Sequence, residues 1–197
     1  MIVQRSDYNI SIVLFTNLGV GAGTENIAKI LAEQLLKNDT SHRVRIVQTD
    51  YMGPYSANKR VDIQNENGLI IDEIKSPLNI KFIQRMLKGP PLWHKIGEIV
   101  KIVLYMILNF KKISSILKED DCIIFLSYNE AWGWYPFKRQ NNYFVISGDC
   151  GMPTVGLAKC ILEKFADSLH FLTRAQEERF GSTQILTFNI SRIRKNL

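Results

Sequence analysis

The stretch NISIVLFTNLGVGAGTENIAKILAEQL, residues 9–35, decides the fold of this chain. Five of its first seven residues are apolar and three of these are β-branched, a pattern that predicts a buried strand. Three glycines at alternate positions follow, and apolar residues then recur at helical spacing from Ile27 to Leu35. Because glycine allows positive φ and close backbone approach, it suits a tight turn from strand to helix. The stretch therefore predicts the strand–loop–helix unit that opens an α/β fold.

The rest of the chain continues this alternation of strands and helices. We expect strands over residues 43–49, 68–74, 122–127, 142–146, 168–172 and 185–188, helices over 24–37, 80–88, 92–118 and 152–165, a short helix opening at Thr173, and a long loop over 51–67. Such alternation indicates a Rossmann-like, doubly wound α/β fold: a mostly parallel sheet with helices on both faces. Ligands of these sheets bind at the carboxyl ends of the strands, where the glycine loop lies.

The glycine loop is a candidate phosphate site, since the N-terminus of a helix presents free N–H groups and a partial positive charge. A P-loop requires a lysine after the glycines, and none is present. The fingerprint G-x-G-x-x-G fails in both registers, because its third position falls on Thr24 or Asn26. Asp50 follows the second expected strand, where a ribose-binding acid would lie, so a nicotinamide-binding oxidoreductase domain stays open. A tight turn with no ligand is the other alternative.

Residues 22–35 and 42–50, AGTENIAKILAEQL and HRVRIVQTD, resemble the start of GT-B glycosyltransferases of the group 1 (family 4) type. In that family the first loop reads G-G-x-E, a helix of the form LAxxL follows, and the second strand reads G-H-x-V-x-V-x-T. The matching residues here are Gly23, Glu25, Leu31, Ala32, Leu35, His42, Val44, Ile46 and Thr49. Ala22 and Ser41 replace two of the usual glycines. Residues 121–125, 142–147 and 166–173 fit the order of the later strands of the family.

The resemblance implies one half of a GT-B fold, in which two Rossmann-like domains face each other across a cleft. Residues 1–190 would be the N-terminal, acceptor-side domain, and 191–197 the start of the interdomain linker or a truncated end. The C-terminal donor domain would then be absent from this chain. The whole enzyme, a hexosyltransferase, would move a sugar from a nucleotide sugar to a lipid-linked or saccharide acceptor without a tightly bound cofactor. The domain by itself is expected to be inactive.

The resemblance also implies roles for particular residues. The first loop lies against the donor diphosphate, a role that falls on Gly21, Ala22, Gly23 and Thr24. Many members carry a histidine after the strand matching 143–147, whereas this chain has Asp149, a weak catalytic candidate or a turn residue. The cluster YNEAWGWY, residues 128–135, has the aromatic and amide groups that stack on sugars. From it we take Asn129 and Trp132 as acceptor-side candidates, with simple packing as the alternative.

Residues 81–95, KFIQRMLKGPPLWHK, alternate basic and apolar side chains, as an interfacial segment does. The candidate membrane-facing residues are Phe82, Arg85, Leu87, Lys88, Leu92 and Trp93. In the long helix that follows, polar residues from His94 to Glu119 form one stripe at spacings of three and four, and nearly every other position is apolar. Such a wide apolar face must be covered. The alternative is a core helix on the sheet with a solvated basic loop, and a non-catalytic, membrane-docking subunit that partners a separate donor domain also stays open.

Composition limits the class of protein. The chain has 197 residues, of which 46% are apolar and 22% charged, as in an ordinary globular domain. A net charge of +6 favours anionic partners such as nucleotides or lipid head groups, and we expect no nucleic-acid partner. Three cysteines form no CxxC pair and three histidines are scattered, so we expect reduced thiols and no metal site. We expect a cytoplasmic protein, peripheral on the inner face of the cell membrane if the interfacial segment binds lipid.

Overall fold

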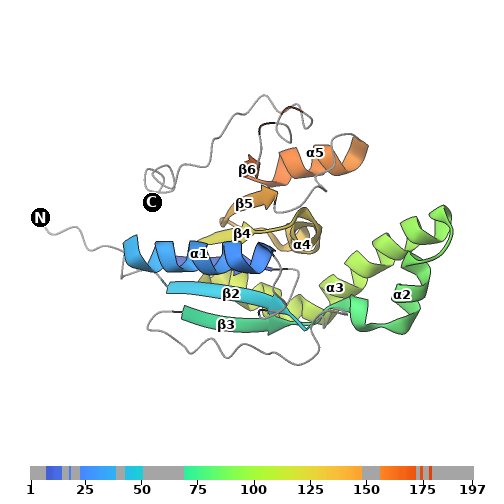
Figure 1. Ribbon diagram of the computed structural model, residues 1–197, viewed down its shortest axis with the longest axis horizontal. Helices are drawn as coiled ribbons and strands as arrows, with labels where there is room; N and C mark the ends of the chain where they lie inside the picture. Colours follow the sequence, from blue (N-terminus) through green and yellow to red (C-terminus); the bar gives the residue numbers. More distant parts are fainter. Residues whose placement is uncertain are drawn as a thin grey trace, which may run out of the picture.

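A computed structural model describes residues 8–14, 18, 23–38, 43–50, 69–147, 156–171, 174 and 178. Six strands form one sheet in the order β3-β2-β1-β4-β5-β6, and all five strand pairings are parallel (Figure 1). The strands are β1 (Asn9–Val13), β2 (Arg43–Thr49), β3 (Leu69–Ile74), β4 (Cys122–Phe125), β5 (Asn142–Ser147) and β6 (Ser168–Phe171). This is the doubly wound order, with its switch point between β1 and β4.

Helices cover both faces of the sheet, so the predicted fold class is confirmed. On one face α1 (Gly23–Asn38) buries Ala28, Leu31 and Leu35 against β1, β2 and β4. On the other face lie α3 (Pro91–Glu119), α4 (Tyr128–Trp134) and α5 (Gly156–Phe165). Their buried side chains pack against Ile123, Phe125 and Tyr143 of β4 and β5. The centre of the sheet is therefore apolar on both sides, as parallel strands require.

A helical hairpin projects beyond the carboxyl edge of the sheet (Figure 1). After β3 the chain passes through the 3₁₀ helix η1 (Pro77–Asn79) into α2 (Lys81–Leu87), which packs on the first turns of α3. The 29 residues of α3 rise about 43 Å, whereas the seven residues of β2 span about 23 Å. Since α3 ends at the amino edge of the sheet, where Asp121 N donates to Asn9 O at 2.9 Å, nearly half of the helix lies outside the sheet.

The long helix departs from the expectation that its apolar face is covered. Its buried side includes part of the polar stripe, with Lys101 and Asn109 only 9% and 3% exposed. Its apolar residues Ile99 and Ile107 are instead 64% and 65% exposed. Asn109 explains this orientation, because its amide accepts from Lys75 N at 2.7 Å and donates to Lys75 O at 2.8 Å. The end of β3 thus binds a polar side of the helix.

Most element boundaries lie within two residues of the predicted ones, and α4 is the main element that the sequence reading missed. The 3₁₀ helix η2 (Tyr135–Phe137) follows it. Aromatic residues and a glycine give the α4 segment little helix propensity, so burial of Ala131 and Trp134 decides its conformation. The expected loop over 51–67, the helix opening at Thr173 and the strand over 185–188 lie outside the described residues, apart from two single positions of that helix.

Candidate functional site

The candidate site lies at the carboxyl edge of the sheet, where β1 leads toward α1. Leu14, directly after β1, donates its N–H to Val47 O at 2.8 Å, and so continues the β1–β2 pairing by one residue. Leu18 N donates to Gln48 Oε1 at 2.9 Å, which fixes this part of the connection beside the end of β2. The first turn of α1 therefore opens beside the switch point of the sheet, the usual ligand position in doubly wound folds.

The described residues leave room for a side chain at the first residue of α1. Gly23 is exposed, and a Cβ built on it would meet none of their atoms within 4 Å. Packing therefore does not require glycine at this position. The first N–H groups of a helix lack partners within it, and here the helix dipole adds partial positive charge at an accessible point. Gly23 is therefore the described position of this turn that an anion could reach.

Glu25, the acidic residue of the GT-B-like motif, lies inward rather than in this open space. It is 2% exposed, and its Oε1 lies 2.5 Å from Lys29 Nζ one turn along α1. The ion pair offsets the negative charge of the carboxylate close to the helix start. The carboxylate is therefore buried and paired with Lys29 of the same helix.

Asp50 does not have the geometry of a free ribose-binding acid. Its Oδ1 accepts a hydrogen bond from Ser76 N, its carbonyl accepts from Asn79 Nδ2 at 3.1 Å, and its N–H donates to Ile74 O at 2.9 Å. These contacts join the end of β2 to the turn between β3 and η1. One carboxylate oxygen is thus already committed to the backbone, which weakens the nicotinamide alternative.

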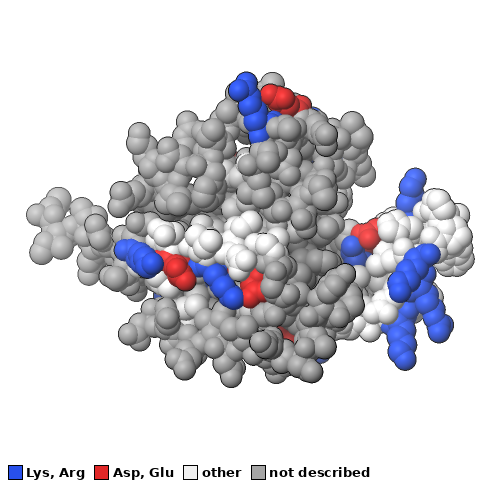
Figure 2. Space-filling model, in the orientation of Figure 1, with Lys and Arg blue, Asp and Glu red and all other residues white. Residues whose placement is uncertain are grey.

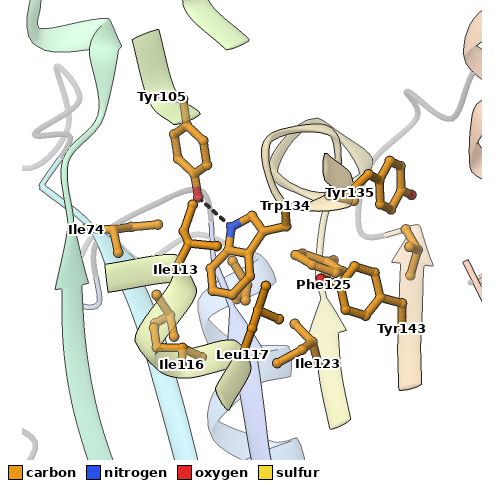
Figure 3. Packing of buried hydrophobic residues seen from close by; sticks show 14 of the residues in the cluster. Ile74, Tyr105, Ile113, Ile116, Leu117, Ile123, Phe125, Trp134, Tyr135 and Tyr143 are labelled. Carbon is orange, nitrogen blue, oxygen red and sulfur yellow. Dashed lines mark hydrogen bonds between the residues drawn. The ribbon is translucent and has the colours of Figure 1, made fainter. Parts of the chain in front are cut away.

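The acceptor-side candidates lie on α4, after β4 at the same edge of the sheet. Trp134, fully buried, donates Nε1–H to Tyr105 Oη of α3 at 3.0 Å (Figure 3). Gly133 allows this close seating, because a Cβ there would lie 2.3 Å from Tyr105 Cδ1. Trp132, directly before Gly133 on α4, is half-buried. Asn129 belongs to α4, but its side chain lies outside the described residues, as do Gly21, Ala22 and Asp149 as a whole.

The candidate membrane-facing residues lie on the projecting hairpin, and five of the six are exposed. Those five are Phe82, Arg85, Lys88, Leu92 and Trp93. Leu87 is half-buried instead: its Cδ2 would lie 3.2 Å from a Cβ on Gly97 of α3. Two helices that pack as a hairpin need an inner side, and Leu87 contributes to it rather than to the outer surface.

The opposite, amino edge of the sheet holds a network of charges that the sequence reading missed. Arg45 of β2 lies 2.7 Å from Glu119 and 3.8 Å from Asp120, and its Nε lies 3.4 Å from Asp72. Burial raises the pKa of Asp120, which also accepts from Ser11 Oγ. The hydrogen bond from Arg45 lowers the pKa of Glu119. The one sign of this network in the sequence is Arg45 itself, a charged residue within the alternating strand RVRIVQT. The structure shows that its position is half-buried.

A cavity of about 460 Å³ adjoins this network, lined by Leu117, Lys118, Asp120, Asp121, Arg139, Gln140 and Asn141. Three of its lining groups are bound in the fold. Asp121 Oδ2 accepts from Asn9 N at 3.0 Å, Asn141 Nδ2 donates to Leu117 O at 3.2 Å, and Asp120 faces Arg45. The cavity lies at the edge of the sheet away from α1's first turn, so we assign it no part in the candidate site.

Within the described parts of the chain, no cluster of three or more His, Cys, Asp or Glu side chains could hold a metal ion. Among the same residues, no helix combines the length and the apolar character needed to cross a bilayer. Comparison with models of known protein families gives no match, and comparison with curated proteins gives none either. The candidate site therefore rests on the geometry of the carboxyl edge.

Proposed function

We infer that this chain is the acceptor-side domain of a GT-B glycosyltransferase, which transfers a sugar from a nucleotide sugar to a lipid-linked or saccharide acceptor. One observation carries the proposal: Gly23, in the first turn of α1 beside the switch point of a parallel sheet, is exposed, and a Cβ on it would meet no described atom within 4 Å. The resemblance of residues 22–50 to the family supports the same reading.

The chemistry needs stabilisation of a leaving group. When a sugar leaves its nucleotide, negative charge develops on the diphosphate, and preorganised N–H donors stabilise that charge. Gly21, Ala22, Gly23 and Thr24 would supply these donors from the backbone, and glycine and alanine let a diphosphate approach closely. The second domain of the family would hold the rest of the nucleotide sugar.

The acceptor would lie along the same edge, near Trp132 of α4, with Asn129 from the same helix beside it. An aromatic face packs on the apolar side of a sugar ring, and an amide binds its hydroxyl groups. We place the domain in the cytoplasm and, for a lipid-linked acceptor, at the inner face of the cell membrane. The commitment of Asp50 to the Ser76 backbone makes a nicotinamide enzyme the weaker candidate.

The test uses the open position at Gly23. In NMR titrations of the chain with nucleoside diphosphates, we expect backbone signals of the first turn of α1 to shift. Gly23→Asp should weaken this binding at least about tenfold, the factor that corresponds to 1.4 kcal/mol. Its carboxylate stands where the diphosphate lies, while an acid near a helix start does not destabilise the fold. Gly23→Ala is the matched control and should bind as the wild type does.

Two results would overturn the proposal. One is the absence of shifts in α1 at about 10 mM nucleoside diphosphate, a concentration that detects millimolar dissociation constants. The other is binding that Gly23→Asp leaves unchanged. Tight binding of NAD together with weak binding of nucleoside diphosphates would favour the oxidoreductase alternative instead.

A further inference from the structure

The projecting hairpin of α2 and α3 carries an apolar surface that the described residues leave largely exposed, although Phe110 at its inner end packs on Phe137. Along α3, apolar side chains recur at spacings of four, three, four, four and three residues: Leu92, Ile96, Ile99, Val103, Ile107 and Phe110. We call these six residues the α3 stripe. Leu92 at its outer end is 69% exposed, and every member is more than a third exposed. Eighteen residue steps make the stripe about 27 Å long.

Buried polar contacts hold the stripe outward. Gly97, Lys101, Tyr105 and Asn109 occupy the side of α3 that faces the protein. Lys101 Nζ lies 2.5 Å from Glu98 Oε2, Tyr105 accepts from Trp134, and Asn109 binds the Lys75 backbone. Trp134 and the Lys75 backbone would lose their partners on α3 if the helix turned to bury the stripe, whereas the Lys101–Glu98 pair lies within α3 and would turn with it. The exposure is therefore built into the packing, and a continuous apolar surface of this kind marks an interaction site.

The charge of the hairpin identifies the partner. Between Lys75 and Leu104, which covers α2 and the projecting half of α3, the chain has six Lys and Arg against one Glu, so this segment carries +5. The rest of the chain has 19 Lys and Arg against 18 Asp and Glu, and carries +1. Lys81, Arg85, Lys88 and Lys95 are all exposed near the tip of the hairpin. Figure 2 shows basic side chains interspersed with uncharged ones over the projecting end, on the right of the view.

We propose that the α2–α3 hairpin docks the protein on a membrane surface that contains anionic lipid. The α3 stripe, with exposed Trp93 next to Leu92 at its outer end, would enter the boundary between head groups and acyl chains, and the four basic residues would bind anionic head groups. A partner protein or a second copy could cover an apolar stripe, but a membrane also accounts for a tip rich in basic residues and Trp and free of acids over residues 75–97.

The hairpin projects from the carboxyl edge of the sheet, the edge where α1 begins (Figure 1). Docking would therefore bring a lipid surface to the side of the protein that carries the candidate diphosphate site. The two proposals concern different residues, and their tests are separate. Lipid binding does not depend on nucleotide binding.

The experiment is co-sedimentation of the chain with vesicles of phosphatidylcholine alone and with added phosphatidylglycerol. We expect binding to the anionic vesicles. The triple variant Leu92→Ser, Ile99→Ser, Ile107→Ser should bind at least about tenfold more weakly, because it removes the apolar contact. The quadruple variant Lys81→Gln, Arg85→Gln, Lys88→Gln, Lys95→Gln should show a larger loss, up to several hundredfold, because each basic residue near an anionic surface strengthens binding about fivefold.

Two controls match these variants. Ile30→Ser removes an apolar side chain that is 60% exposed on α1, on the other face of the sheet, and Lys37→Gln removes an exposed charge from the same helix. Both should bind vesicles as the wild type does, and circular dichroism should show that all variants fold. Equal binding to neutral and anionic vesicles, or equal binding by wild type and hairpin variants, would overturn the proposal. So would a stable dimer that the triple variant dissociates, found together with no vesicle binding.

Discussion

At the scale of single residues, two buried tyrosines on the same face of the sheet differ in how their hydroxyl groups are used. Tyr105 Oη accepts a hydrogen bond from Trp134 Nε1 at 3.0 Å. Tyr143 Oη is buried without a hydrogen-bond partner among the described residues, although its ring packs edge-to-face on Phe125 and lies under Lys138 Nζ. Burial raises the pKa of the Tyr143 hydroxyl above its ordinary value. The same residue type therefore contributes differently at the two positions.

We predict that Tyr143→Phe leaves the free energy of unfolding unchanged or raises it by about 1 kcal/mol, since it removes an unsatisfied group. Tyr105→Phe should lower it by about 1–2 kcal/mol, because a buried donor loses its acceptor. Because the folded pKa of Tyr143 lies above the unfolded value of about 10, stability is full below pH 10 and falls as the pH rises past it. Tyr143→Phe should flatten that fall. Urea unfolding at pH 7 and above pH 10 measures both effects, and a cost for Tyr143→Phe as large as that for Tyr105→Phe would contradict the assignment.

At the scale of elements, α3 shows where sequence reading succeeds and where it stops. Its length and helical state follow from periodicity, and the polar stripe from His94 to Glu119 is visible in the sequence. Which side of the helix is covered is not visible, because hydropathy favours burial of the apolar side. The buried side here is decided by partners distant in sequence, chiefly the Lys75 backbone that binds Asn109. For the same reason α4 was missed, since its partner is Tyr105 of α3.

For α3 we predict an order of mutational effects that reverses the order of hydropathy. Ile99→Ser should change the free energy of unfolding by no more than about 0.5 kcal/mol, because the side chain is 64% exposed. Asn109→Leu should cost about 2–4 kcal/mol, since it leaves both Lys75 N and Lys75 O without their partner. Chemical denaturation of the two variants measures the difference. A larger loss for Ile99→Ser would mean that the stripe is covered in solution.

At the scale of the whole molecule, alternation of strands and helices was enough to predict the parallel sheet and the helices on both faces. The order of the strands follows from packing and chirality rules rather than from any one residue. The distribution of charge was harder to see. The net charge of +6 describes the chain as a whole, whereas the structure gathers basic residues on one projecting hairpin and pairs Arg45 with acids at the amino edge.

This separation of charge predicts that salt affects lipid binding and stability differently. When NaCl is raised from about 0.1 M to about 0.5 M, the electrostatic screening length falls from about 10 Å to well below 8 Å. Exposed basic residues then attract anionic lipid more weakly. We expect the fraction bound to anionic vesicles to fall severalfold. The free energy of unfolding should change little, because the Arg45 network is partly buried and less screened. Sedimentation and urea unfolding at the two salt concentrations test this, and vesicle binding that does not respond to salt would contradict it.

The inward-facing amide of Asn109 has one more consequence, for uniqueness of structure. The hydrophobic effect alone would favour rotations of α3 about its own axis that bury the α3 stripe. Only one rotation lets Asn109 meet both main-chain groups of Lys75. Asn109 therefore works as a rotational lock, like a single asparagine that fixes the register of a coiled coil. It selects one rotation of α3, and in that rotation the apolar α3 stripe is exposed and can contact a membrane surface.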